Sequence, residues 1–343
     1  MHIYLNYIIW GLRMATIREI AKYVGVSQTT VSRVLNNDPK LSVSDETYSK
    51  INAAAKELGY KKKNFSAQIR NIAFLYWIPE QEELEDIYFK NIKLEMEKQA
   101  ELCHITMVRY QKSDGIDAID KNTSAIIAIG KFSVEETEKM KAITPNVIFA
   151  EFAADESLFD LVRPNLALMI RQMVDYFVAH GHTNIGYIGG GSGYDYTLSK
   201  IMETRERAFR ESATIRSVLN ENNIFVAENL SLKDGYRLAL EAIDKLGDNM
   251  PTAFCVANDA LAIGALQAFN EKGWAIPQRV SFFSINNISV SKYVSPPLTT
   301  FNIDITLECQ TILKLLKERL LENRTIPKAV YIAGTPIFRK STL

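Results

Sequence analysis

The segment Gly25–Asn37, which reads GVSQTTVSRVLNN, gathers amide, hydroxyl and guanidinium side chains within one short stretch. Such groups can read the edges of DNA bases, because arginine pairs with guanine, and glutamine with adenine, through two hydrogen bonds each. Serine and threonine hydroxyls, like the first amides of a helix, suit phosphate oxygens. These residue types predict a surface that contacts nucleic acid if a helix presents them together.

The flanking residues predict two short helices joined by a tight turn. Thr16 and Glu19 have the spacing of a capping box at the start of the first helix. Gly25 suits the left-handed backbone that ends this helix, and Ser27 is a good cap for the second. Apolar residues recur at helical spacing in both: Ile17, Ile20, Ala21 and Val24 in the first, then Val31, Val34 and Leu35 in the second.

A third helix is predicted from a cap at Ser44 to about Leu58, with Gly59 as its stop. Three short helices, of which the first two are joined by a tight turn, form the helix-turn-helix layout. A helical hairpin with a solvated polar face is the alternative. The caps, the turn glycine, the apolar anchors and the local charge together favour DNA binding.

Charge is distributed unevenly along a chain whose formal net charge is zero. Residues 14–63 carry 9 Lys and Arg against 5 Asp and Glu, whereas residues 64–343 carry 30 against 35. A basic head on a mildly acidic body indicates that contact with nucleic acid is confined to the head. A chance fluctuation of surface charge is the alternative for a difference of this size.

Length, cysteines and the first residues restrict the protein class. The chain of 343 residues, 47% of them hydrophobic, is typical of a globular protein with more than one domain. Its three cysteines have no metal-ligand spacing and imply no disulfide framework, so a cytoplasmic location is expected. The apolar residues 1–13 are too short to cross a membrane and lack the features of a signal peptide. We expect them to be a non-native or disordered leader before Met14; an apolar arm that packs on another surface is the alternative.

From Ile72 onward, continuous apolar runs such as Ala125–Gly130 alternate with helical patterns such as Leu166–Ala179. This alternation predicts parallel sheets with helices on both faces. The number of strand–helix units, about ten, is too large for one small sheet. We therefore expect two similar α/β subdomains with a cleft between them.

The predicted strand ends carry side chains that suit a sugar. Ligands of open parallel sheets bind at the carboxyl ends of the strands. The ends here are Trp77, Glu151, Gly189–Gly193, Asn258–Asp259 and Asn286–Asn287. Amides and carboxylates bond hydroxyl groups, and an aromatic face covers the C–H side of a sugar. Trp77 and Tyr88 are predicted to supply that face, with a plain core role as the alternative for each.

Other chemistry has no support in the motifs. The run Gly189–Gly193 lacks the Lys and Ser or Thr of a phosphate-binding loop, and the spacing of a dinucleotide fingerprint or a nucleophile elbow. His180 and His182 flank a glycine without a nearby acidic or cysteine partner, which favours a turn over a zinc site. We expect no metal or other cofactor and no catalytic set.

The head resembles the DNA-binding head of the LacI/GalR family of bacterial repressors, almost without a gap over Thr16–Tyr60. The stretch GVSQTTVSRVLN carries the most specific part of the resemblance. It implies that Gln28, Thr29 and Arg33 read operator bases. It also implies that four residues lie near the DNA backbone: Ser27, Thr30, Ser32 and Asn36. Thr16 is expected to contact DNA as well.

The join between head and body, residues 61–71, departs from the family pattern. In that family a short hinge helix inserts a leucine into the minor groove at the operator centre, but KKKNFSAQIRN lacks the usual alanine–leucine run. Phe65 and Ile69 are its large apolar residues. Lys61, Lys62 and Lys63 are expected to follow phosphates.

The body resembles the effector-binding core of the same family, which has the type I periplasmic-binding-protein fold. The similar stretches are VAHGHTNIGYIGG, FCVANDALAIGALQAFNEKGWAIPQRVSFFSINN and VSPPLTTFN. The resemblance implies effector contacts from Asn165, Arg205, Asn258 and Asn286, and Asp259 is added as their neighbour. Arg205 can bridge two neighbouring hydroxyls with its fixed fork of donors.

The expected domains are a head at 14–60, a linker at 61–71 and a core at 72–343. Within the core, one subdomain is expected to comprise 72–181 with 302–326, and the other 182–301 with 327–343.

The expected function is that of a homodimeric transcription repressor that binds operator DNA and no membrane, with a small sugar controlling its affinity. The stretch VSFFSINNISVSKYVSPPLTT is similar to galactose- and lactose-operon regulators, which favours a galactoside. Pro164 stands where the family often has an acid, and Asn286 where an Asp is common, so the choice of effector stays open. A nucleobase corepressor is the alternative ligand. A solute-binding protein and a sugar-processing enzyme are the rival classes. The first needs an export signal and no DNA-binding head, and the second needs a convergent acid and base.

Overall fold

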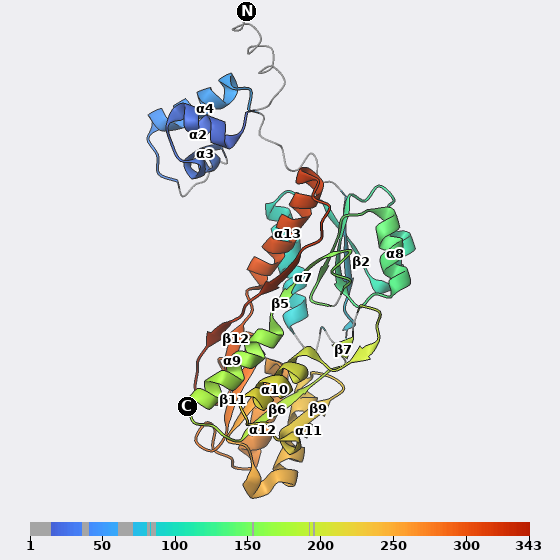
Figure 1. The fold of residues 1–343 in the computed structure, drawn as a ribbon, viewed down its shortest axis with the longest axis vertical. Helices are drawn as coiled ribbons and strands as arrows, with labels where there is room; N and C mark the ends of the chain where they lie inside the picture. Colours follow the sequence, from blue (N-terminus) through green and yellow to red (C-terminus); the bar gives the residue numbers. More distant parts are fainter. Residues whose placement is uncertain are drawn as a thin grey trace, which may run out of the picture. The chain divides into compact units, whose positions relative to one another are not determined.

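The computed structural model describes residues 15–35, 41–60, 71–80, 83, 87–152, 154–191, 193–194 and 196–343. The chain divides into two compact units between residues 65 and 66 (Figure 1). We call the first unit the head and the second the core, and each is described by itself. The predicted leader 1–13, and residues 61–70 of the predicted linker, lie outside the described residues.

The head consists of three helices around a small apolar centre: α2 (Ile17–Val24), α3 (Gln28–Leu35) and α4 (Asp45–Glu57). The predicted capping box is confirmed, because Thr16 N donates to Glu19 Oε2 at 2.7 Å and Glu19 N donates to Thr16 Oγ1 at 3.3 Å. Gly25 has a φ of 78°, as the tight turn between α2 and α3 requires. The buried centre is formed by Ile20, Ala21, Val31, Val34, Ile51, Ala54 and Ala55.

The core contains two six-stranded sheets with helices packed against them, as the alternation of apolar runs and helical patterns predicted (Figure 1). The first sheet has the order β13-β5-β4-β3-β1-β2, and all of its pairs are parallel. Its strands are β1 (Ile72–Trp77), β2 (Met107–Tyr110), β3 (Ala125–Gly130), β4 (Val147–Ala150), β5 (Asp160–Pro164) and β13 (Ala329–Ile332). The helices α7 (Ile87–Leu102), α8 (Val134–Ile143) and α13 (Ile305–Glu322) accompany it.

The second sheet has the order β14-β12-β11-β10-β6-β9, and only the pairing of β14 with β12 is antiparallel among the described pairs. Its strands are β6 (Ile185–Gly190), β9 (Ile224–Ala227), β10 (Ala253–Val256), β11 (Ser281–Asn286), β12 (Thr299–Asn302) and β14 (Thr335–Ile337). Its helices are α9 (Leu166–Ala179), α10 (Thr204–Ile215), α11 (Leu232–Leu246) and α12 (Asp259–Glu271). Two short strands, β7 (Gly193–Tyr194) and β8 (Lys200–Ile201), form a separate ribbon, and 3₁₀ turns lie at Lys112–Asp114, Ile116–Ala118, Glu221–Asn223 and Gly247–Asn249.

The chain passes between the two sheets after β5, after β12 and after β13. The structure therefore differs from the predicted subdomain bounds in two places. The helix α9 was assigned to the first subdomain but packs with α10 and β10 of the second, and residues 327–332 were assigned to the second subdomain but include β13 of the first sheet. β13 pairs in parallel with β5 of the first sheet, with Ala329 opposite Leu161. The reason is that a strand's partner depends on residues far away in the sequence. Nothing within AVYIAGTPI shows that its two halves, β13 and β14, join different sheets.

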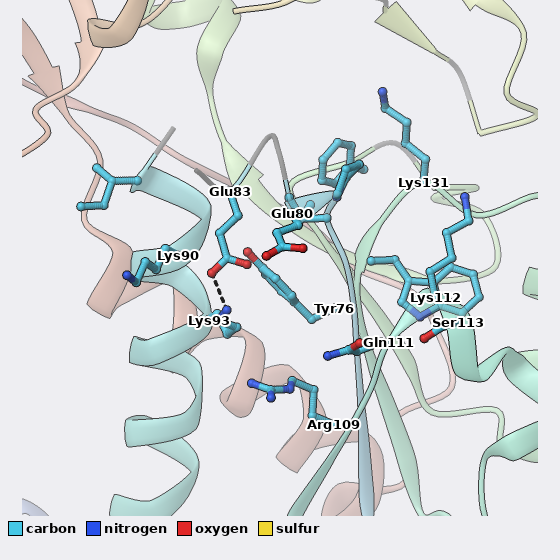
Figure 2. Close-up of a pocket in the computed structure, with 15 residues that line it drawn as sticks. Tyr76, Glu80, Glu83, Lys90, Lys93, Arg109, Gln111, Lys112, Ser113 and Lys131 are labelled. Carbon is cyan, nitrogen blue, oxygen red and sulfur yellow. Dashed lines mark hydrogen bonds and ion pairs between the residues drawn. The ribbon is translucent and has the colours of Figure 1, made fainter. Parts of the chain in front are cut away.

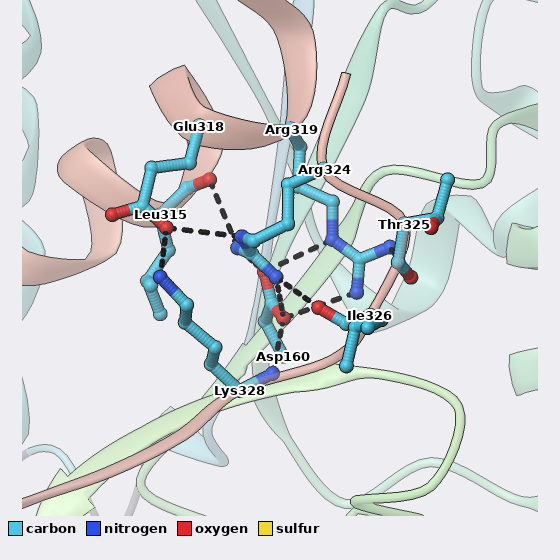
Figure 3. A network of polar contacts seen from close by, with 8 residues as sticks. All are labelled: Asp160, Leu315, Glu318, Arg319, Arg324, Thr325, Ile326 and Lys328. Carbon is cyan, nitrogen blue, oxygen red and sulfur yellow. Dashed lines mark hydrogen bonds and ion pairs between the residues drawn. The ribbon is translucent and has the colours of Figure 1, made fainter. Parts of the chain in front are cut away.

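A buried ion cluster joins β5 to the end of α13 and to the segment that leads into β13 (Figure 3). Asp160 is fully buried, and its carboxylate accepts two hydrogen bonds from Arg319, both at 3.0 Å. Arg324 donates two more, at 2.6 and 3.0 Å, and the backbone amide of Lys328 donates one at 2.7 Å. Two-pronged, charge-assisted bonds to one carboxylate fix the relative positions of all three segments.

Candidate DNA-binding surface and effector site

The helix α3 presents its polar residues away from the apolar centre of the head. At 100° per residue, Gln28, Ser32, Thr29 and Arg33 follow one another over an arc of roughly 140°, and Val31 and Val34 lie outside that arc and are buried. Gln28 and Thr29 are exposed, whereas Ser32 and Arg33 are half-buried at the margin of the head. The three residues predicted to read bases thus share one side of one helix.

The start of α3 is built as predicted. The Ser27 Oγ accepts a hydrogen bond from Thr30 N at 3.0 Å, and the two hydroxyl oxygens lie 2.8 Å apart. The partial positive charge of this helix end suits a phosphate oxygen. At the start of α2 the Thr16 hydroxyl donates to Glu19 Oε2 at 2.9 Å. The other predicted DNA contacts, Asn36, Lys61, Lys62 and Lys63, lie outside the described residues.

In the core, Arg205 lies near the start of α10, and 12% of its side chain is exposed. Its Nε donates to Glu203 Oε1 at 2.9 Å, and its Nη1 donates to the Ala257 carbonyl at 3.0 Å. The second bond places the guanidinium beside Asn258, which follows Ala257 at the end of β10. The positive charge also acts on Glu151 of the first sheet, where it favours the ionised carboxylate.

Glu151 follows β4 in a left-handed conformation, with a φ of 69°. Its Oε1 accepts a hydrogen bond from the Tyr88 hydroxyl at 2.8 Å. Burial raises the pKa of Glu151, and hydrogen bonding to Glu308 and Tyr88 and the charge of Arg205 act against that rise. Tyr88 is thus hydrogen-bonded to Glu151, and the charge of Arg205 is near enough to act on the same carboxylate; we call these three residues the polar cluster, whose groups can bond hydroxyls.

Two of the predicted asparagines begin helices. Asn165 Oδ1 accepts from Leu168 N at 3.1 Å and caps α9. Asn258 Oδ1 accepts from Leu261 N at 2.9 Å and caps α12, and Nδ2 of Asn258 donates to the Leu230 carbonyl at 3.1 Å. These bonds account for both side-chain oxygens, so a ligand contact by either residue stays a prediction. Asn286 ends β11 with a φ of 115°.

Asp259 has a structural role that differs from the ligand contact predicted for it. Its buried carboxylate accepts hydrogen bonds from the side chains of Ser284, Ser291 and Thr300 and from the backbone amide of Ile288. Burial raises the pKa of Asp259 to about 6, and these four donors oppose the rise. All four described hydrogen bonds to this carboxylate come from protein donors. They connect β11, β12 and the loop after β11.

Trp77 lies at the wall of a hollow rather than on an open stacking surface. Its side chain is 5% exposed, it packs on Phe132 with 4.5 Å between ring centroids, and its Nε1–H has no hydrogen-bond partner among the described residues. The hollow has a volume of about 780 Å³, within the usual range of small-molecule sites. Figure 2 shows acidic and basic side chains around it, with Lys93 paired to Glu83.

Metal-binding clusters and membrane spans are both absent from the described ranges. No group of three or more His, Cys, Asp or Glu side chains there could hold a metal ion. No helix there is long and apolar enough to span a membrane. Cys103, Cys255 and Cys309 are free thiols.

Comparisons with known proteins match both units. Residues 16–63 match the family model for bacterial regulatory proteins of the lacI family, and residues 174–342 match the model for a periplasmic binding protein-like domain. The chain is 48% identical over 328 residues to the HTH-type transcriptional regulator GanR of Bacillus subtilis, with 96% of this chain and 99% of that protein covered. The chain belongs to the LacI family of bacterial transcription regulators.

Further relatives agree with this membership. The HTH-type transcriptional regulator GalR of Lacticaseibacillus casei is 33% identical over 333 residues, with 96% of this chain and 100% of that protein covered. Among solved structures, a CelR–cellobiose complex has a TM-score of 0.68 at 19% identity and covers 95% of this chain and 99% of its own. A lac repressor dimer bound to operator and the anti-inducer ONPF has a TM-score of 0.65 at 22% identity, with 96% and 100% covered. The predicted fold, a helix-turn-helix head with a two-sheet α/β core, is confirmed for this LacI-family chain.

Two acidic residues of this LacI-family core were not among the predicted effector contacts. Glu151 was recognisable as a polar strand end, but the resemblance pointed to other positions. Glu308 lies in the first turn of α13, where an acidic residue is ordinary because it suits the helix dipole. Its burial arises from the packing of α13 on the first sheet, which no local pattern shows.

Proposed function

We propose that this protein is a sequence-specific transcription repressor of a carbohydrate operon, and that a small sugar in the core controls its operator affinity. The observation that carries the DNA-binding part is the polar arc of α3. Gln28, Thr29 and Arg33 lie on one side of a helix whose other side is anchored by Val31 and Val34. An amide and a guanidinium group on such a helix match the hydrogen-bonding edges of adenine and guanine.

A sugar is supported by the polar cluster of Tyr88, Glu151 and Arg205. The carboxylate of Glu151 after β4, the phenol of Tyr88 on α7 and the guanidinium group of Arg205 on α10 can bond several hydroxyls of one ligand. The relatives named GanR and GalR and the CelR–cellobiose complex support a carbohydrate, and we propose a galactoside. A ligand that contacts both sheets would favour one arrangement of the two subdomains and so couple to the head.

We further propose a cytoplasmic homodimer that binds its ligand without converting it. Two recognition helices in a symmetric dimer would contact half-sites one helical turn of DNA apart. Incubation with galactose, lactose and melibiose, followed by product analysis, is expected to return each sugar unchanged. The function itself is tested by mobility-shift assays with genomic fragments, in which addition of the correct galactoside should change the amount of bound DNA. Nucleobases serve as comparison ligands, and an effect of these alone would replace the galactoside.

We expect Arg33→Ala to weaken binding to a selected operator by about 1–3 kcal/mol and to relax the choice of base at one position per half-site. The reason is the loss of a two-pronged contact to a guanine. The measurement is duplex selection from a random library, compared between the wild-type and variant proteins. Lys50→Ala, which removes a charge from the exposed pair with Glu46 on α4, is the matched control and should leave base choice intact. An equal loss of affinity for every sequence in Arg33→Ala would show that Arg33 contacts phosphate only.

A further inference from the structure

The hollow beside Trp77 lies where the topology of the first sheet changes direction. In this sheet β1 lies between β2 and β3, so the chain passes from β1 to one neighbour and then returns to the other. In doubly wound sheets such a change of direction leaves a crevice at the carboxyl ends of the strands, and ligands bind there. The lining comes from the ends of β1 and β2, from residues that follow β3 and β4, and from α7 (Figure 2). The hollow therefore occupies the expected ligand position of this sheet.

The described lining of the hollow carries more positive than negative charge. Its five basic side chains are Lys90, Lys93, Arg109, Lys112 and Lys131. Two acidic side chains, Glu80 and Glu83, lie among them, which leaves an excess of three positive charges. A cleft lined by an excess of one sign of charge concentrates ligands of the opposite sign. The ligand that suits this hollow is an anion.

Two of these lysines have no ion-pair partner among the described residues. Lys93 pairs with Glu83, and Arg109 pairs with Glu97 at 3.1 Å, whereas Lys90 and Lys112 lack such a pair. Both side chains are exposed, so they can turn to a ligand without breaking a contact within the protein. An ammonium group is a compact charge with three donors, which suits the oxygens of a phosphate group.

The two lysines reach the hollow from different elements. Lys90 lies on α7, and Lys112 lies in the 3₁₀ turn that follows β2. Figure 2 shows them on opposite sides of the hollow. Gln111 and Ser113 flank Lys112 in the lining and can bond hydroxyl groups. One ligand that carries both an anionic group and hydroxyls would use all four side chains.

We propose that this hollow binds the phosphate group of a phosphorylated sugar, with Lys90 and Lys112 as its counter-charges. A phosphate monoester carries about two negative charges at neutral pH, which matches two ammonium groups, whereas a carboxylate carries one. This inference rests on the proposed function, because it takes the ligand to be a sugar, and it narrows the galactoside to a phosphate ester.

The contact should be sensitive to salt. Because Lys90 and Lys112 are exposed to solvent, dissolved ions screen their attraction for a phosphate group. The advantage of a phosphorylated sugar over the neutral sugar should therefore shrink as the salt concentration rises from about 0.05 to about 0.5 M. Binding of the neutral sugar should change little over the same range.

The test compares galactose with galactose 1-phosphate and galactose 6-phosphate by calorimetric titration of the full-length protein at low salt. We expect one of the two esters to bind at least about tenfold more tightly than galactose. The double variant Lys90→Ala, Lys112→Ala should lose this advantage and keep the wild-type affinity for galactose. Lys98→Ala is the matched control, since Lys98 is another exposed lysine of α7 that is not among the lining residues, and it should keep the advantage.

Three results would overturn the phosphate site. These are equal affinities of the wild-type protein for galactose and both esters, an unchanged advantage in the double variant, and an advantage that does not depend on salt. Galacturonate and inorganic phosphate separate the parts of the ligand. If either binds as tightly as the preferred ester, the assignment to a phosphorylated sugar is wrong. Operator affinity without ligand is the control for folding and should be equal in all the proteins.

Operator titrations in the presence of each sugar distinguish this proposal from the proposed function. A response to neutral galactosides, without any advantage for the esters, would leave the proposed function intact and overturn the phosphate site. Tight binding of an ester that is lost in the double variant, with operator affinity unchanged by every sugar, would support the phosphate site and contradict the proposed function.

Discussion

Replacement of Asp160 by alanine is expected to lower the free energy of unfolding of the core by about 3–5 kcal/mol, because it leaves buried cations without a counter-charge. Asp160 accepts two hydrogen bonds each from Arg319 and Arg324, whose side chains are only 5% and 13% exposed. The carboxylate connects β5 with the end of α13 and with the segment before β13. Without it, these three segments lose their common hydrogen-bond acceptor. Urea unfolding followed by far-ultraviolet circular dichroism measures the loss.

The contribution of Asp160 should also depend on pH in a defined direction. Burial alone would raise its pKa, but the bonds from Arg324 and Arg319 outweigh burial and hold the pKa of Asp160 below its usual range. The stabilisation is then fully present above the unfolded pKa of about 3.9 and is lost as the pH falls through the lower folded value. The difference in unfolding free energy between wild type and Asp160→Ala should stay constant near neutrality and shrink only in strong acid.

Asp175→Ala is the matched control for this prediction. Asp175 pairs with Arg216 at 2.7 Å, but the two side chains are 48% and 46% exposed, so water screens the pair. Its loss should have little effect on the urea midpoint. Equal effects of the two variants would mean that the buried cluster adds no more than an ordinary surface pair.

Arg205→Ala is expected to abolish the response to the effector while operator binding without effector stays unchanged. The guanidinium is held by Glu203 and the Ala257 carbonyl, so its position is fixed before the ligand arrives. Arg205 is expected to donate two charge-assisted hydrogen bonds to sugar hydroxyls. Their loss should weaken effector binding by at least about 3 kcal/mol, which is more than a hundredfold in affinity. Operator titrations over a range of galactoside concentrations measure both quantities in one experiment.

Arg207→Ala is the matched control, because it removes another arginine side chain from α10 at an exposed position. Its operator binding should respond to the effector as in the wild-type protein. Arg205→Lys keeps the charge but loses the planar fork of donors, so its response should be intermediate. A normal response curve for Arg205→Ala would remove this residue from the effector site. Loss of operator binding in that variant would instead indicate damage to the fold.

Elements with strong local signals were predictable from the sequence. The head helices were predicted from the caps at Thr16 and Ser44 and from the turn at Gly25. Such signals are local, because capping bonds involve residues only three positions apart. The strand Ala125–Gly130 and the helix Leu166–Ala179 were predicted with the bounds observed, since apolar runs and helical periodicity are also local.

Elements that depend on distant partners were not predictable in the same way. β5 carries Asp160 and Arg163 and so does not read as an apolar strand, whereas β13 is apolar in sequence but largely exposed. β5 is stabilised by the buried ion cluster and by its neighbours in the sheet, and β13 by pairing with β5. The change of sheet between β13 and β14 follows from this pairing.

In the candidate site, too, some features were predictable from the sequence and others depend on distant partners. Arg205 and Asn258 were placed by family resemblance, and the structure brings them together through the Ala257 carbonyl. Asp259 follows Asn258 directly but is turned into the protein, where hydroxyl donors from β11 and β12 surround it. The burial of Glu308 also depends on distant parts of the chain, and acidic residues at helix starts are too common to single it out.

The most direct test of the account is the affinity of the full-length protein for one selected duplex, measured by fluorescence anisotropy without and with saturating galactoside. We predict binding to the selected duplex at least about 10³-fold tighter than to a scrambled one, as in specific protein–DNA complexes. We also predict a change of about 5- to 150-fold on addition of the sugar, the usual range of coupling between two sites. Equal affinity for the selected and scrambled duplexes at low salt, with and without sugar, would contradict both the role of α3 and its control by the core.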